Sequence, residues 1–415
     1  MATAARPLPA PTGHADRADR ADHSGHSGHS GHSGHSGTRV GRSPHPRARA
    51  VRHLGPNWYA TVMGTAIVAT AGAGLPLGIP GLRTLCTAFW ALSLVLLTAL
   101  LVARATHWTH HRDQARAHLL DPATAPFYGC LAMALLAVGG GALTVGRDWI
   151  GTPAAVALDA VLFTTGTLIA LTAAVAVPYL MVVRHRVDPS QVTPVWLLPL
   201  VAPMVSAALG PLLVPHLPAG QPRETLLLAC LAMFGLSLLA TLVTLPMVFA
   251  RLITGGPLPL ALTPSLFLVL GPLGQSTTAV DKFAVVAPGV VSAPYEQGFA
   301  VLAVLYGVPV MGFALFWLAL AGAMVVRARR RGMGFTMTWW AFTFPVGTCV
   351  TGAEGLARHT GLVVYDGLAV ALYALLLAAW AVAATHTVRG LVSGRLLAAP
   401  PRARPVPAPT TARTT

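Results

Sequence analysis

The chain has 415 residues, of which 54% are hydrophobic and 10% are charged, and its formal net charge is +15. Soluble domains carry about 25% charged residues, so this composition excludes an ordinary water-soluble fold of this size. The basic residues sit between apolar blocks and in the two ends of the chain, which is the pattern of membrane topology and not of a nucleic-acid footprint.

The N-terminal segment, residues 1–54, is polar and Arg-rich and contains a His-Ser-Gly repeat. It lacks the apolar area to form a core, so we expect it to be a disordered cytoplasmic tail. Imidazole binds zinc, nickel and copper, which makes weak metal binding by the repeat an alternative to a simple spacer. The histidines of the repeat are His23, His26, His29, His32 and His35.

Ten apolar blocks follow, each close to the roughly 20 residues that a helix needs to cross a bilayer. They are residues 57–79, 83–103, 126–146, 155–183, 193–215, 224–250, 259–280, 296–326, 335–357 and 362–388. This pattern predicts an all-α polytopic membrane domain with ten transmembrane helices over residues 55–390. Residues 391–415, rich in Pro, Ala, Arg and Thr, are expected to form a second disordered cytoplasmic tail.

The segments between the blocks alternate in basic charge. With the N-terminus in the cytoplasm, each outer segment holds one basic residue, whereas the inner segments hold Arg groups, apart from the one that holds Arg251 alone. The single outer residues are Arg83, Arg147, Arg223, Lys282 and Arg358. This positive-inside pattern predicts a multi-pass protein of the plasma membrane with an even number of spans and both termini in the cytoplasm.

Acidic residues are nearly absent from the blocks. Asp159, Glu354 and Asp366 fall within them, each near an end. Because a carboxylate at the bilayer centre would indicate a proton or cation relay, these positions favour passive conduction. Glu354 and Arg358 are four residues apart on one expected helix, so we predict an ion pair between them, with a role of Glu354 at the outer mouth as the alternative.

Glycine and proline gather at mid-depth in the odd-numbered blocks, together with hydroxyl side chains. Proline breaks helical hydrogen bonds, and freed backbone groups in a membrane must face protein or water. We therefore expect the odd-numbered helices to surround a path suited to a small anion, with close helix packing as the alternative at each position. The candidate lining or kink residues are Gly64, Thr65, Gly140, Pro199, Pro203, Gly271, Pro272, Pro345, Gly347 and Thr348.

Four of the odd-numbered blocks carry motifs that together resemble one family. The motifs are Pro56-Asn57-Trp58-Tyr59 with Met63-Gly64-Thr65, Trp196-Leu197-Leu198-Pro199 with Pro203, Gly271-Pro272-Leu273-Gly274-Gln275, and Trp339-Trp340-Ala341-Phe342-Thr343-Phe344-Pro345-Val346-Gly347-Thr348. In this order they resemble the tellurite-resistance/dicarboxylate transporter family. That family includes bacterial TehA-like channels, plant slow-type anion channels, and yeast malate and sulfite transporters.

The resemblance implies five helical hairpins around a central pore, lined by the odd-numbered helices, in a homotrimer. It also implies that Phe344 of the ninth block occludes the pore. Ala66 stands where the family's first motif has its last glycine, and the residues after Pro345 are closer to the yeast transporters than to the plant channels. An anion channel and a proton-coupled carrier for C4-dicarboxylates or sulfite both remain open at this point.

Other function classes have less support in the sequence. A metal-ion transporter needs His, Cys or carboxylate side chains at ligand spacing within its spans, and the blocks lack them. The chain contains neither an H-E-x-x-H nor a G-x-S-x-G motif, and its four cysteines lie singly in apolar blocks. We therefore expect no enzyme activity and no cofactor.

Overall fold

The computed structural model describes residues 55–110, 112–184 and 188–397. Residues 1–54, with the His-Ser-Gly repeat, and residues 398–415 lie outside the described residues, so the predictions for them stay predictions. The described ranges consist of helices joined by short loops and contain no strand, which confirms the predicted all-α class.

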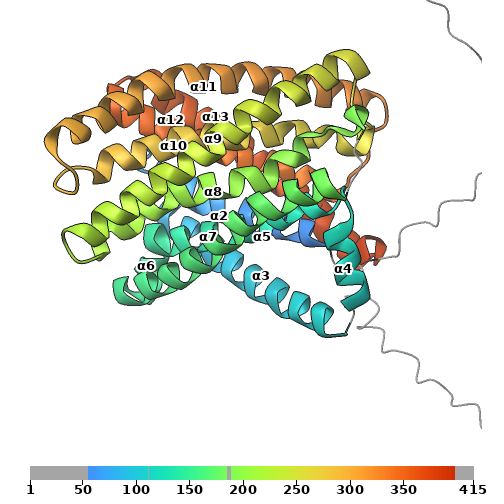
Figure 1. Ribbon diagram of the computed structural model, residues 1–415, viewed down its shortest axis with the longest axis horizontal. Coiled ribbons are helices and arrows are strands. Elements are labelled where there is room, and N and C mark those ends of the chain that lie inside the picture. Colours follow the sequence, from blue (N-terminus) through green and yellow to red (C-terminus); the bar gives the residue numbers. More distant parts are fainter. Residues whose placement is uncertain (1–54, 111, 185–187, 398–415) are drawn as a thin grey trace, which may run out of the picture. The chain divides into compact units, whose positions relative to one another are not determined.

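Seven helical segments of the described ranges are long and apolar enough to cross a membrane. They are α3 (Leu82–His110), Ala125–Ile150 around α5 (Tyr128–Gly141), α7 (Thr152–Val183), Pro194–His216 around α8 (Leu197–Leu209), α9 (Gln221–Gly255), α11 (Ala293–Arg330) and α13 (Val363–Val392). Figure 1 shows most of them running along a common direction, with the short α4 (Arg112–Leu120) at one end. The chain is therefore a polytopic membrane protein.

The three other expected spans contain shorter helices. These are α2 (Tyr59–Ala73), α10 (Leu270–Val286) and α12 (Phe344–Thr360), with 15, 17 and 17 residues. Each follows a 3₁₀ segment, namely η1 (Pro56–Trp58), η7 (Leu260–Val269) and η8 (Met337–Phe342). Because a 3₁₀ helix rises about 2.0 Å per residue, these segments add length with few residues. Seven is thus a count of helical segments that are both long and apolar enough, and ten spans stays a prediction.

A 3₁₀ segment opens every odd-numbered expected span. Besides η1, η7 and η8, η2 (Ala125–Phe127) leads into α5 and η5 (Pro194–Trp196) leads into α8. Proline takes one of the first two positions in η1, η2 and η5, and Pro264 lies within η7. Proline suits a first turn because its φ is fixed near the helical value and its missing N–H would have no partner there. The prolines therefore mark where these spans begin.

Burial separates the helices into two sets. In the spans around α5 and α8, 89% and 83% of the most apolar window is buried, whereas the other five candidate spans are 28–33% buried. Most residues of α2, α10 and α12 are also buried. We call α2, α5, α8, α10 and α12 the inner helices, and α3, α7, α9, α11 and α13 the outer helices.

Contacts among the inner helices close on themselves. α2 contacts α5, α5 contacts α8, α8 contacts α10, α10 contacts α12, and α12 contacts α2. Each inner helix also packs against the outer helix that follows it in the chain. The inner helices thus form a closed circuit with an outer helix behind each member.

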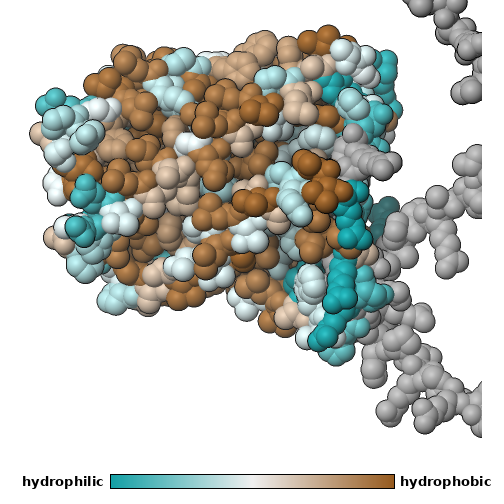
Figure 2. Space-filling view, viewed as in Figure 1, coloured by the Kyte–Doolittle hydropathy of each residue, from teal (hydrophilic) through white to brown (hydrophobic). Residues whose placement is uncertain are grey.

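The outer helices present apolar side chains to their surroundings. Val182 of α7, Leu305 of α11 and Val392 of α13 are 86%, 72% and 85% exposed. Figure 2 shows brown apolar atoms over the middle of the visible face and teal hydrophilic atoms toward its two ends. An exposed apolar band flanked by polar ends fits a surface whose solvent is lipid.

Glycines let the inner helices approach closely. A Cβ added to Gly274 of α10 would lie 2.5 Å from backbone atoms of Thr348 and Cys349 in α12. A Cβ on Gly129 would collide with the backbone of Leu198, and one on Gly347 with the side chain of Ile67. These positions are therefore close helix–helix crossings, as small residues in membrane bundles commonly are.

The inner spans around α5 and α8 are irregular along their length. After Gly139, Gly140 and Gly141, α5 passes into a π-helical turn over Ala142–Gly146. α8 contains Pro203 and passes into a 3₁₀ segment over Gly210–His216. Glycine and proline cause such departures because they weaken or remove the regular i→i−4 hydrogen bonds.

Candidate functional site

Three cavities lie among the inner helices, and each shares lining residues with the next. The first, of about 290 Å³, is lined mainly by the starts of the inner spans. The second is small, about 10 Å³, and shares Met63, Leu198, Leu268 and Pro345 with the first. The third, of about 570 Å³, is lined by later parts of the inner helices and shares Phe344 with the second. The two large cavities are thus separated by a constriction at Phe344.

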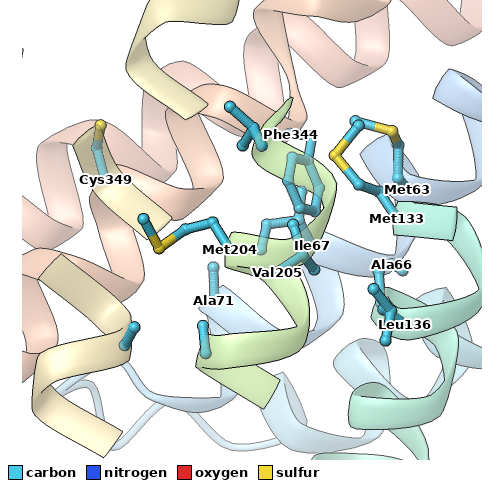
Figure 3. Packing of buried hydrophobic residues seen from close by; sticks show 14 of the residues in the cluster. Met63, Ala66, Ile67, Ala71, Met133, Leu136, Met204, Val205, Phe344 and Cys349 are labelled. Atoms are coloured by element: carbon cyan, nitrogen blue, oxygen red, sulfur yellow. The ribbon is translucent and has the colours of Figure 1, made fainter. Parts of the chain in front are cut away.

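Every inner helix contributes to the lining of the constriction, through Met63 of α2, Met133 of α5, Val201 of α8, Gly271 of α10 and Phe344 of α12. The rest of the lining comes from Leu197, Leu198, Leu268 and Pro345. Figure 3 shows the ring of Phe344 beside the thioether side chains of Met63 and Met133. Phe344 is 3% exposed, so its ring fills the space between the helices at this level.

Gly271 leaves room on the wall of the constriction. A Cβ built on Gly271 would have no atom within 4 Å, in contrast to Gly274 one turn further along the same helix. The absence of a side chain at this position gives the second cavity its volume.

Sequence reasoning missed Met63, Met133 and Val201, although a signal for them exists. One lining residue from each inner helix stands seven positions after a residue of the 3₁₀ segment that opens its span. The five pairs are Pro56 and Met63, Pro126 and Met133, Pro194 and Val201, Pro264 and Gly271, and Met337 and Phe344. An internal repeat anchored on these prolines would have placed four of the five residues at one level, with Met337 in the proline's position for Phe344.

The third cavity has charged residues in its lining, and most of them are cations. Four of the single basic residues between the expected spans, Arg83, Arg147, Lys282 and Arg358, line it, together with His216. Glu354 is its one acidic lining residue. By contrast, no acidic or basic side chain of the described residues lines the first cavity. Its polar lining groups are Asn57, Ser265, Thr336 and Thr338.

Asp281 organises the cations on one wall of the third cavity. Its side chain is 2% exposed, and its Oδ2 lies 2.7 Å from Nη2 of Arg358 and 3.1 Å from Nζ of Lys282. Its Oδ1 lies 3.2 Å from Nε2 of His359. Sequence reasoning overlooked Asp281 because it stands one position beyond the expected end of the seventh span. Arg83 forms a separate, more exposed pair of 2.6 Å with Asp148.

The predicted ion pair between Glu354 and Arg358 is wrong. Arg358 binds Asp281 of the neighbouring helix instead, through both Nε and Nη2. Glu354 is buried, with 6% of its surface exposed, and its Oε1 has no hydrogen-bond partner. Asp281, which lies across the contact between α10 and α12, pairs with the arginine that the spacing of four had assigned to Glu354.

The residues predicted to line or kink the path divide into two groups. Gly271, Phe344 and Pro345 line the cavities. The others do not line the three cavities and lie buried within or between inner helices, and they are Gly64, Thr65, Gly140, Pro199, Pro203, Pro272, Gly347 and Thr348.

The buried group has identifiable packing partners. A Cβ on Gly64 would collide with Thr343, and one on Gly140 would press on Leu209. Thr65 accepts a hydrogen bond of 3.0 Å from Nε1 of Trp380 on α13, which turns its hydroxyl away from the cavities. The hydroxyl of Thr348 donates to the carbonyl of Pro345 at 2.7 Å, and so it satisfies the helix backbone.

Comparisons with known proteins show the family of the chain. Residues 53–388 match the family model described as voltage-dependent anion channel. An uncharacterised transporter of Methanocaldococcus jannaschii is 26% identical over 83% of this chain and 96% of its own. A sulfite efflux pump of Arthroderma otae is 27% identical over 82% of this chain and 91% of its own. A sulfite efflux pump of Trichophyton rubrum is 27% identical over 76% of this chain and 85% of its own.

Proposed function

The chain belongs to the voltage-dependent anion channel family, and from this premise we propose that it conducts small anions through the three cavities, with Phe344 as the occluding residue. One observation carries the proposal: a constriction of about 10 Å³, lined by residues of all five inner helices, lies between two much larger cavities. An apolar constriction of this kind closes a path by filling it and by making a thin column of water unfavourable.

The architecture that we propose for this function has ten transmembrane helices in five hairpins around a central pore. The difference in burial between inner and outer helices and the closed circuit of inner contacts support it. The channel domain spans residues 55–390, and the tails 1–54 and 391–415 lie in the cytoplasm of a plasma-membrane protein, as the basic residues between the spans indicate. A homotrimer, as the family resemblance implies, completes the proposal.

The charge distribution suits an anion at both cavities. The cations around the third cavity raise the local concentration of anions at its mouth. The first cavity faces the starts of the inner spans, and the N-terminal end of a helix carries partial positive charge. An anion therefore meets favourable potential on both sides of the constriction.

Among small anions we propose sulfite as the transported species, because two relatives of the chain are sulfite efflux pumps. Proteoliposomes that contain the purified full chain test this directly. We expect sulfite to cross faster than in protein-free liposomes, with chloride, nitrate and malate measured in parallel to rank the anions. Equal flux with and without protein for every anion would overturn the function, and a preference for malate would overturn the substrate.

The alternative is a proton-coupled carrier for dicarboxylates or sulfite. The buried Glu354 on the third cavity supports this alternative as a candidate proton acceptor. A carrier of that kind needs a pH gradient, whereas a passive path conducts when the pH is equal on both sides. We expect sulfite flux to persist at equal pH on the two sides. Flux that appears only with a pH gradient would establish the carrier.

A further inference from the structure

Glu354 has an environment that differs from that of every other charged residue on the third cavity. Its side chain is 6% exposed, and Oε1 is buried without a hydrogen-bond partner. The nearest basic residue on its own helix, Arg358, is held by Asp281 at 2.7 Å. Glu354 therefore combines a position on the cavity wall with an unsatisfied carboxyl group.

Groups from four helices, and Gly74 just after a fifth, surround this carboxyl. Gly74, just after α2, approaches it so closely that a Cβ there would overlap the carboxylate. Cys86 of α3 and Tyr373 of α13 interact electrostatically with it, and neither carries positive charge. Asp281 and Lys282 of α10 and Arg358 of α12 complete the charged surroundings, but their ion pairs join them to one another. No described cation lies within ion-pair distance of Glu354.

The protonation state of Glu354 changes the charge of the anion path. An ionised carboxylate without a partner in a buried site is costly, and it repels an anion that passes between Phe344 and the outer cations. A neutral carboxyl group removes both penalties and offers an O–H donor to the anion. The ionised side chain thus opposes the passage of an anion, and the neutral side chain does not.

We propose that Glu354 is a proton-binding site that makes anion passage depend on its protonation. A proton from the water of the third cavity binds the carboxylate, the path becomes neutral at this point, and anions then cross the constriction at Phe344. This inference rests on the proposed anion transport and adds to it the residue through which pH acts.

The test measures nitrate flux in proteoliposomes at equal pH on both sides, because nitrate keeps its charge over the range used. For the natural chain we expect flux to rise about tenfold from about pH 8 to about pH 5. Glu354→Gln imitates the neutral form, so its flux should stay at the high level throughout. A Gln variant that keeps the natural pH response, or a natural chain whose nitrate flux is flat with pH, overturns the proposal.

Two matched variants separate Glu354 from other titratable groups. Asp159 is also a buried carboxylate with an oxygen lacking a hydrogen-bond partner, but it lies at Gly139, away from the three cavities. Asp159→Asn should therefore keep the pH response. His216 also lines the third cavity, and we expect His216→Gln to keep the pH response as well. Loss of the response in His216→Gln with its retention in Glu354→Gln would assign the effect to the histidine and contradict the proposal.

A shorter acid covers the case in which Glu354→Gln does not fold. Glu354→Asp keeps a titratable group and withdraws it by one methylene, so its pH response should remain with a displaced midpoint. A midpoint unchanged from the natural chain overturns the proposal. Absence of nitrate, chloride and sulfite flux at every pH would refute anion transport itself, which is a different failure from flux without pH dependence.

Discussion

Asp281 and Arg358 stand 77 positions apart in the chain, and their side chains meet at 2.7 Å across the contact of α10 with α12. Asp281 is almost fully buried, and Lys282 and His359 share it. The pair fixes two inner helices to each other beside the third cavity and holds a cation on the cavity wall. One buried carboxylate thus links the packing of the bundle to the charge of the path.

Loss of this carboxylate should destabilise the protein. Asp281→Asn leaves Arg358, Lys282 and His359 without their shared counter-ion, and we expect a loss of about 2–3 kcal/mol in the free energy of unfolding. Thermal unfolding in detergent measures it. Asp148→Asn is the control, because its pair with Arg83 is more exposed and should contribute less than about 1 kcal/mol. Equal losses in the two variants would show that burial of Asp281 does not matter.

Gly274 and Gly271 should respond in opposite ways to the same added methyl group. At Gly274 the new Cβ would lie 2.5 Å from the backbone of α12, so Gly274→Ala should cost about 1–3 kcal/mol of stability. At Gly271 the new Cβ meets no atom within 4 Å, so Gly271→Ala should unfold close to the natural temperature. A Gly274→Ala variant as stable as Gly271→Ala would mean that α10 and α12 do not pack as closely as described.

The sequence allowed the class of fold to be predicted, because membrane-spanning helices leave local signals. Blocks of apolar residues and the basic residues between them report the membrane spans directly. Phe344 stands beside Pro345 in a recognisable motif and lies at the constriction. Its effect on conduction stays a prediction.

The faces of the inner helices could not be predicted in the same way. A helix that is buried all round has no polar side to show which residues face a cavity and which face a neighbour. Gly64 and Gly271 look alike in the sequence, yet Gly64 packs against Thr343 and Gly271 opens on the second cavity. Met63 and Met133 likewise read as ordinary apolar residues.

Ion pairs between residues that are far apart in the sequence could not be predicted either. The spacing of Glu354 and Arg358 favours a local pair, but a buried carboxylate on α10 offers Arg358 a bidentate partner. Charge-assisted bonds of that geometry are stronger than an exposed pair on one helix. Only the contact between α10 and α12 shows that Arg358 pairs with Asp281 and not with Glu354.

The space at Gly271 predicts a way to close an opened path. If Phe344→Ala opens the constriction, Gly271→Leu in the same chain should occlude it again, because the new side chain would lie at the second cavity on the neighbouring helix α10. We expect the double variant to return flux to within about threefold of the natural chain, with the departure from additivity expected for neighbouring residues. Flux that stays at the level of Phe344→Ala would place Gly271 off the path.

The most direct measurement of the central claim is anion flux through Phe344→Ala, compared at matched protein amount with the natural chain and with Phe283→Ala. Phe344 lines two cavities, so its truncation should raise flux tenfold or more, as a rough estimate, with little loss of stability because the new space is wet. Phe283 is fully buried on the same bundle between Phe234 and Phe299, so its truncation should cost about 3–5 kcal/mol without raising flux. If Phe344→Ala loses as much stability as Phe283→Ala and gains no flux, Phe344 is a packing residue and the path does not run through the constriction.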